Sequence, residues 1–128
     1  MDIIDLNHVA LHVRDVEDSV RFYRDQMGLQ QISRPAFTFP GAWFRLGTTQ
    51  ELHLIGERED RVVSGPRSTH FALRVASLDK VCRELEGRSV ALLGRQVRPD
   101  GALQAYVEDP DGHCIEFTQL HPQFQHDG

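Results

Sequence analysis

The chain has few of the features that would place it outside an ordinary globular class. Its only two cysteines, Cys82 and Cys114, form neither a disulfide framework nor a metal-binding pair spacing. No apolar run approaches membrane-spanning length, and the first residues lack the basic and then apolar profile of a signal peptide. Basic residues are outnumbered by acidic ones, 14 to 19, so no electrostatic footprint for nucleic acid is visible. We therefore expect a cytoplasmic protein that binds neither nucleic acid nor a membrane.

The length of the chain, 128 residues, suits one domain that buries a core without disulfides or structural metals. Its composition is ordinary, with 40% hydrophobic and 26% charged residues and no low-complexity run. Histidine is the unusual residue, because seven are more than we would expect if all were ordinary surface residues.

A short phrase with a histidine at its second position occurs twice, at residues 7–13 and 69–75. Four identical pairs share an offset of 62 residues, close to half the chain: His8/His70, Ala10/Ala72, Leu11/Leu73 and Val13/Val75. In both copies apolar residues alternate with polar or small ones, as in a strand with one buried face. The chain is therefore expected to contain a duplicated unit.

The elements expected in the first half are a strand, a helix and three further strands. The helix is capped by Asp15, carries an apolar stripe from Val16 to Met27 and ends at Gly28. The strands are expected at residues 7–13, 29–33, 42–46 and 51–55.

The second half repeats this order. Its helix is capped by Ser77 and ends at Gly87, and turns are expected at residues 98–101 and 109–112. The strands are expected at residues 69–75, 89–93, 103–108 and 114–118. We predict an α+β fold of two tandem βαβββ modules in a single domain, residues 1–128. The modules cover about residues 5–56 and 69–120, joined by a linker at about 57–68, and their mixed sheets curl around a metal-binding cavity.

A second correspondence extends the repeat to its other end. Trp43 and His53 lie ten positions apart, as do Tyr106 and Glu116, so His53 matches Glu116. Each of these two residues points away from its apolar strand neighbours. Together with the histidines of the first strands they form the predicted metal-ligand set: His8, His53, His70 and Glu116. Three imidazoles and a carboxylate suit Zn, Fe, Ni or Mn, and the structural alternative is an ion pair of Glu116 with one histidine.

Several motifs make the chain resemble the vicinal oxygen chelate superfamily over about residues 5–119. The motifs are His8-Val9-Ala10-Leu11, Phe22-Tyr23 with Gly28-Leu29, Glu51 to Ile55, His70 to Val75, and Asp109-Pro110-Asp111-Gly112-His113 followed by Glu116. This superfamily includes glyoxalase I, thiol transferases of fosfomycin resistance, extradiol dioxygenases and bleomycin-binding proteins. The resemblance implies paired βαβββ modules around a metal and places its ligands at the same four residues.

The expected function is that of a metal-dependent, glyoxalase-like lyase or isomerase, similar to lactoylglutathione lyase. It would act on a small substrate with vicinal oxygens through an enediolate-type intermediate, with Glu116 as the catalytic base and its pKa raised for that task. His53 departs from the resemblance, because glyoxalase I usually has a carboxylate there. Two alternatives stay open: a non-catalytic antibiotic-binding or resistance protein on the same fold, and a small Fe(II) extradiol-type dioxygenase.

The remaining candidates are residues expected to line the cavity and contact substrate: Arg45, Arg74, His12, Cys114 and Trp43. Either arginine would hold a substrate carboxylate or phosphonate, with a surface salt bridge as the alternative role. A homodimer is expected, and the sequence leaves open whether the ligands of one site come from one chain or two.

Overall fold

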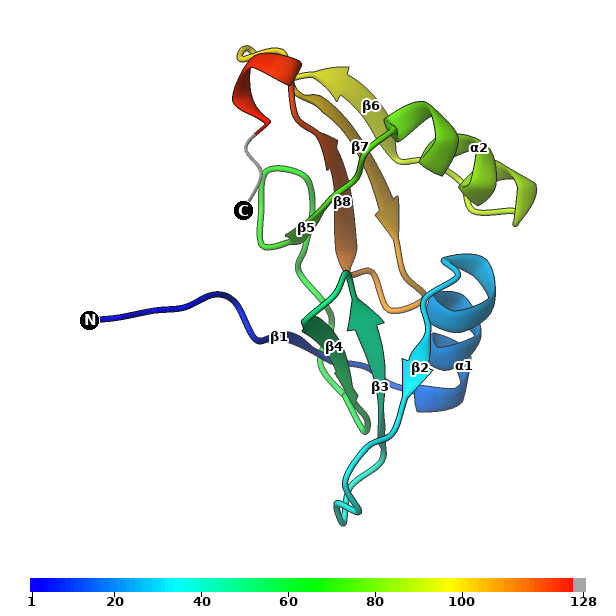
Figure 1. Ribbon diagram of the computed structural model, residues 1–128. Helices are drawn as coiled ribbons and strands as arrows, with labels where there is room; N and C mark the ends of the chain where they lie inside the picture. The colour runs from blue at the N-terminus through cyan, green and yellow to red at the C-terminus, as the bar shows by residue number, and fades with distance from the viewer. Residues whose placement is uncertain (126–128) are drawn as a thin grey trace. The chain divides into compact units, whose positions relative to one another are not determined.

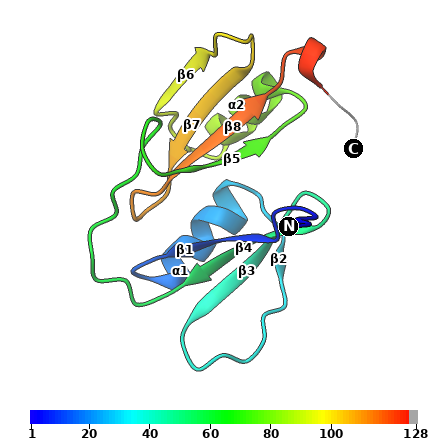
Figure 2. The same ribbon diagram turned by 90° about the vertical axis from the view of Figure 1, so that its left-hand side faces the viewer.

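The computed structural model describes residues 1–125, and within them the chain divides into two compact units. The first unit ends at Arg61 and the second begins at Val62. Each contains one four-stranded mixed sheet with a helix on it (Figures 1 and 2). Among the described residues no helix is long and apolar enough to cross a membrane.

The first unit has the predicted order of elements. Its strands are β1 (His8–His12), β2 (Gln31–Ile32), β3 (Gly41–Leu46) and β4 (Gln50–Ile55), and its helical segments are α1 (Val16–Val20) and η1 (Arg21–Gln26). The order across the sheet is β1-β4-β3-β2, with β1 parallel to β4 and the other pairs antiparallel. The helical segment lies between β1 and β2 in the chain and packs on β3 and β4. The first module is therefore a βαβββ unit, as predicted.

The second unit repeats this topology. Its elements are β5 (Phe71–Arg74), α2 (Leu78–Gly87), β6 (Gly94–Val97), β7 (Leu103–Glu108), β8 (Cys114–Gln119) and a single turn of 3-10 helix, η2 (Pro122–Phe124). The order across the sheet is β5-β8-β7-β6, again with one parallel pair, β5 with β8. Ala10 pairs with His53 in the first sheet, and Ala72 pairs with Glu116 in the second. This register confirms that His53 and Glu116 are equivalent.

Local sequence explains why the helices begin where they do. Asp15 accepts hydrogen bonds from the backbone amides of Glu17 and Asp18, at 2.9 and 3.3 Å, and Ser77 accepts one from Lys80 at 3.2 Å. Both residues are N-caps that satisfy amides without a partner inside the helix. Gly28 has φ +76°, which glycine adopts without strain, and it ends the first helical segment as predicted.

Three expected elements differ from the structure. The first helix continues from Arg21 as a π-helix, in which both Phe22 and Tyr23 are buried. The predicted stripe is buried at Tyr23 and Met27, but the α-helical geometry expected for it ends at Val20. The strand expected at 29–33 shrinks to Gln31–Ile32, because only these residues pair with β3. The strand expected at 89–93 is wrong: Ser89 has φ +64°, and pairing with β7 begins at Gly94.

Each core lies on the helix-covered face of its sheet. In the first unit it includes Leu11, Val13, Tyr23, Phe44, Leu52 and Leu54, all less than a tenth exposed. The alternate residues of these strands therefore form the opposite face, which carries the predicted site residues.

Candidate functional site

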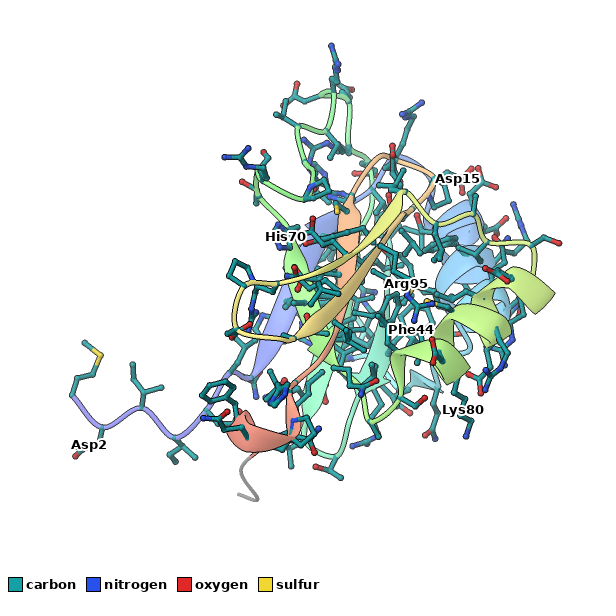
Figure 3. All side chains as sticks on the ribbon, turned by 90° about the horizontal axis from the view of Figure 1, so that it is seen from above. Asp2, Asp15, Phe44, His70, Lys80 and Arg95 are labelled. Atoms are coloured by element: carbon teal, nitrogen blue, oxygen red, sulfur yellow. The ribbon has the colours of Figure 1, made fainter. Side chains whose placement is uncertain are left out.

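The second unit brings His70 and Glu116 together. His70, which is labelled in Figure 3, immediately precedes β5. Glu116 is in the middle of β8, the strand that pairs with β5 in the sheet. The His70 Nε2 atom lies 3.0 Å from Glu116 Oε1. The Glu116 side chain is only 6% exposed and that of His70 is 22% exposed. Two of the four predicted ligands are thus in direct contact within one unit.

The orientation of the His70 ring is set by a backbone carbonyl. Its Nδ1 atom lies 2.9 Å from the carbonyl oxygen of Ser68, which only accepts, so Nδ1 carries a proton and donates it. Nε2 faces Glu116: it donates to the carboxylate when both ring nitrogens carry a proton, and in the singly protonated ring it holds the lone pair that a metal ion would take. Metal-ligating histidines commonly have this arrangement, in which the second nitrogen is fixed by a carbonyl or a carboxylate.

Buried donors hold the other oxygen of Glu116. Oε2 accepts a hydrogen bond of 2.9 Å from Gln104 Nε2 and a short one from the Thr118 hydroxyl. Gln96 donates to the Gln104 side-chain oxygen at 2.9 Å and to the Tyr106 hydroxyl oxygen at 3.2 Å, which extends the network across β6 and β7. Among the described residues, every fully buried side-chain nitrogen or oxygen has a hydrogen-bond partner.

These contacts decide the pKa of Glu116. Burial acts to raise it, but hydrogen bonds from Thr118, Gln104 and His70 outweigh burial, and the net pKa lies below the usual carboxyl value. The direction is opposite to that expected for a base tuned upward. The physical reason is that Gln104 in β7 and Thr118 in β8, which lie on the same face as Glu116, stabilise the carboxylate form.

The first unit places His8 and His53 together in a different way. Their rings stack with centroids 4.1 Å apart and planes at 17°, and the other face of His53 stacks on Trp43 at 3.8 Å and 2°. His53 Nε2 also contacts Glu51 Oε1 at 2.8 Å. Glu51 precedes His53 by two residues on β4, so both project from the same face.

The pairs fit a metal ion to different degrees. His70 Nε2 and Glu116 Oε1 face each other across 3.0 Å, so an ion bound by both would take the place of a proton on Nε2. His8 and His53 are nearly parallel, and an imidazole binds a metal in its own plane, so both bind one ion only after one ring turns. His8 is exposed and has room to turn, whereas His53 is held on both faces. Within residues 1–125 no group of three or more donors is assembled.

The predicted substrate-contacting residues are dispersed. Trp43 and Arg45 share a face of β3, and Trp43 pairs with His53 of β4. Arg45 donates to the backbone oxygen of Thr48 at 3.0 Å. His12 Nε2 donates to the Gly56 carbonyl oxygen at 2.9 Å. Arg74 lies opposite Thr118 and lines a pocket of about 230 Å³.

Cys114 is on the same face of β8 as Glu116 and is almost fully buried. Burial, followed by the negative charges of Glu116 and Glu108, raises the pKa of its thiol. A thiol in these surroundings stays protonated at neutral pH, which suits a wall residue rather than a nucleophile.

Sequence reasoning missed three residues of these clusters. Gln104 and Thr118 flank Glu116 through strand register, and Glu51 supplies a carboxylate beside His53. Thr118 and Glu51 had a usable signal, because each is two residues from a predicted ligand and so shares its face.

The two βαβββ modules, each with an imidazole and a second donor at the equivalent positions, define a class of small duplicated proteins. The chain belongs to the glyoxalase/bleomycin resistance protein/dioxygenase superfamily, whose family model matches residues 5–117. Among curated relatives it is 30% identical to the metallothiol transferase FosB of Lysinibacillus sphaericus over 91% of this chain and 83% of the relative.

Solved structures agree with this assignment. A glyoxalase family protein from Bacillus anthracis superposes with a TM-score of 0.80 and 28% identity, covering 94% of this chain and 98% of the other. TnmS3, an antibiotic binding protein from a Streptomyces species, superposes with a TM-score of 0.75 and 25% identity, covering 94% and 99%. Catalytic and binding proteins therefore share this fold.

Proposed function

We propose that the protein is a metal-dependent lyase or isomerase of the glyoxalase type that acts on a small substrate with vicinal oxygens. The observation that carries this proposal is the buried Glu116 carboxylate facing the Nε2 atom of His70, with Nδ1 of that ring fixed by Ser68. His8 and His53 are the other proposed ligands. The metallothiol transferase among the relatives supports the presence of a metal.

A bound divalent ion would act as a Lewis acid on the two substrate oxygens. The chain's own residues supply the rest. Ser68 orients His70, while Gln104 and Thr118 hold Glu116 through Oε2 and leave Oε1 toward His70. Glu116 is the proposed proton acceptor, and because its pKa is lowered, its position rather than high basicity supports that role.

Metal binding tests the proposal directly. Untagged protein should contain, or take up on incubation with Ni, Zn, Mn or Fe(II), about one equivalent of metal per chain by elemental analysis. His70→Ala and Glu116→Gln should each lower metal affinity at least about tenfold. His121→Gln, which removes an exposed imidazole elsewhere, is the matched control and should keep the metal.

Uptake below about a tenth of an equivalent with all four metals would overturn the proposal. The contact between Glu116 and His70 would then be the structural ion pair that the sequence also allows. A second comparison uses His53→Glu, which restores the carboxylate usual in glyoxalase I. We expect this variant to turn over the hemithioacetal of methylglyoxal and glutathione faster than the parent. Unchanged activity would mean that position 53 is not what separates this protein from glyoxalase I.

A second candidate function is antibiotic binding without catalysis. The similarity to TnmS3 favours it. If the protein only binds an antibiotic, its affinity for that ligand should be unchanged after a chelator has removed all metal. Isothermal titration calorimetry measures this affinity.

We also propose that the protein forms an isologous homodimer. Each sheet leaves two outer strands, β1 and β2 in the first unit and β5 and β6 in the second. Unpaired strand edges favour association with another chain.

A further inference from the structure

A continuous row of aromatic rings crosses the polar face of the first sheet. It starts at His8 on β1, passes His53 on β4 and Trp43 on β3, and reaches the loop between β2 and β3. There the Phe37 ring lies 6.2 Å from Trp43, and Phe39 stacks on Phe37 at 5.1 Å and 25°. The row consists of His8, His53, Trp43, Phe37 and Phe39, and one of its ends is formed by two predicted metal ligands.

The loop that ends this row is held in shape by Arg34. The guanidinium carbon lies 4.9 Å from the Phe37 ring centre and 5.0 Å from that of Phe39, within cation–π range. Arg34 Nη2 also donates to the backbone oxygen of Phe39 at 2.8 Å. A Cβ placed on Gly41 would lie 2.9 Å from this guanidinium, so glycine is what allows Arg34 to lie against the start of β3.

The two phenylalanine rings are fixed but open to solvent. Phe37 is 45% exposed and Phe39 is 40% exposed, in contrast to the His53 side chain at 12%. Large apolar rings exposed side by side are unfavourable in water unless a ligand covers them. Aromatic rings preferentially take another ring in an offset stack or edge-to-face contact. A ligand that carries a planar ring should therefore bind Phe37 and Phe39 better than one that carries an aliphatic chain.

We propose that the aromatic row binds an aryl group of the substrate and so selects aryl-bearing 2-hydroxy or 2-oxo acids. The aryl group would lie on Phe37, Phe39 and the edge of Trp43, and the vicinal oxygens would point along the row toward His53 and His8. The assignment of the oxygens rests on the proposed function, whereas the aryl preference rests on the rings alone.

Three ligands that differ only in the side group separate the contributions. Mandelate carries a phenyl ring, hexahydromandelate a saturated ring of similar size, and lactate a methyl group, all on the same 2-hydroxy acid. Calorimetric titration of the zinc-loaded protein should give mandelate about three- to tenfold higher affinity than hexahydromandelate, the range that aromatic pairing supplies. Trp43 is the sole tryptophan, so its fluorescence should change with mandelate and report contact with the row.

Conservative variants then assign the effect to the loop. Phe37→Leu and Phe39→Leu keep apolar bulk but remove the ring, and each should lower the preference for mandelate over hexahydromandelate at least about twofold. Phe124→Leu is the matched control, because this phenylalanine is 41% exposed and belongs to the other unit. Circular dichroism of each variant would check that it is folded.

Equal affinities for mandelate and hexahydromandelate in the metal-loaded protein would overturn the aryl assignment and leave the proposed function standing. An unchanged preference in both loop variants would also overturn it. Failure to take up metal, with the mandelate preference retained in the metal-free protein, would instead refute the proposed function and support the aryl site.

Discussion

Glu116 is the residue on which the chemistry of the second unit depends. A carboxylate at 5% residue exposure would normally be unfavourable, since burial disfavours the charged form. Here one oxygen faces His70 and the other accepts hydrogen bonds from Gln104 and Thr118. The charge is therefore stabilised locally, and the side chain is held in one place.

Replacing Thr118 with valine tests this stabilisation. The change removes a buried donor to Glu116 and should lower the free energy of unfolding by about 1–2 kcal/mol at neutral pH. The folded-state pKa of Glu116 is lowered, so its charge contributes stability above the unfolded pKa, and this contribution is lost as pH falls through the folded pKa. The cost of Thr118→Val should thus shrink in acid.

Urea unfolding of chelator-treated protein across a pH series measures this effect. The control is Thr48→Val in the exposed turn after β3, which should change stability by less than about 0.5 kcal/mol at every pH. A cost for Thr118→Val that does not vary with pH would mean that the hydroxyl does not act through the Glu116 charge.

Residue-level prediction from the sequence succeeded where the repeat itself carried the information. The equivalence of His53 and Glu116 follows from two matched spacings, and the strand register confirms it. Gln104 lies beyond such reasoning, because a residue becomes a partner of Glu116 only when β7 and β8 are aligned in one register. The stack of His8 on His53 is likewise a matter of side-chain rotamers, which a sequence pattern does not specify.

At the scale of elements, β3 depends on a glycine at its first position. Gly41 pairs with Ile55 of β4, and a side chain there would overlap the backbone oxygen of Leu54 and crowd Arg34. Gly94 begins β6, the outer strand that corresponds to β2 of the first sheet, and has no atom within 4 Å of its missing Cβ. A side chain is therefore excluded at Gly41 and has free space at Gly94.

Alanine substitutions at both positions should separate them. Gly41→Ala should destabilise the protein by about 1–3 kcal/mol, because the clash is with backbone and strand pairing must adjust. Gly94→Ala should be neutral or stabilising by up to about 1 kcal/mol, because it reduces the freedom of the unfolded chain. Thermal and urea unfolding measure both, and comparable effects of the two changes would contradict the assignment of Gly41 to close packing.

The elements that the sequence misplaced have a common physical origin. Residues 89–93 are apolar enough for a strand, but Val90 is buried after the end of α2, and the left-handed backbone of Ser89 redirects the chain. Strand limits at 29–33 similarly depend on how many residues find a partner in β3. Such boundaries are decided by tertiary pairing, whereas the order βαβββ follows from periodicity and caps alone.

At the scale of the whole molecule, the proposed dimer has a candidate contact in the segment before β1. Residues 1–6 form no regular element and extend from the first unit (Figure 1). Four of them are apolar and open: Met1, Ile3 at 75%, Ile4 at 98% and Leu6 at 58% exposure. This segment continues into β1, an outer strand of its sheet, so a second copy could cover the apolar side chains and the strand edge together.

A charge placed on this segment should therefore weaken the dimer. Ile4→Lys should shift the mass measured by light scattering at micromolar concentration toward the monomer, since it puts a cation into an apolar contact. Val97→Lys is the matched control: it also changes a branched apolar residue, 68% exposed, on the outer strand β6 of the second unit. That variant should keep the parent mass. A parent protein that is monomeric would refute the dimer itself, and a dimer that survives Ile4→Lys but not Val97→Lys would move the interface to β6.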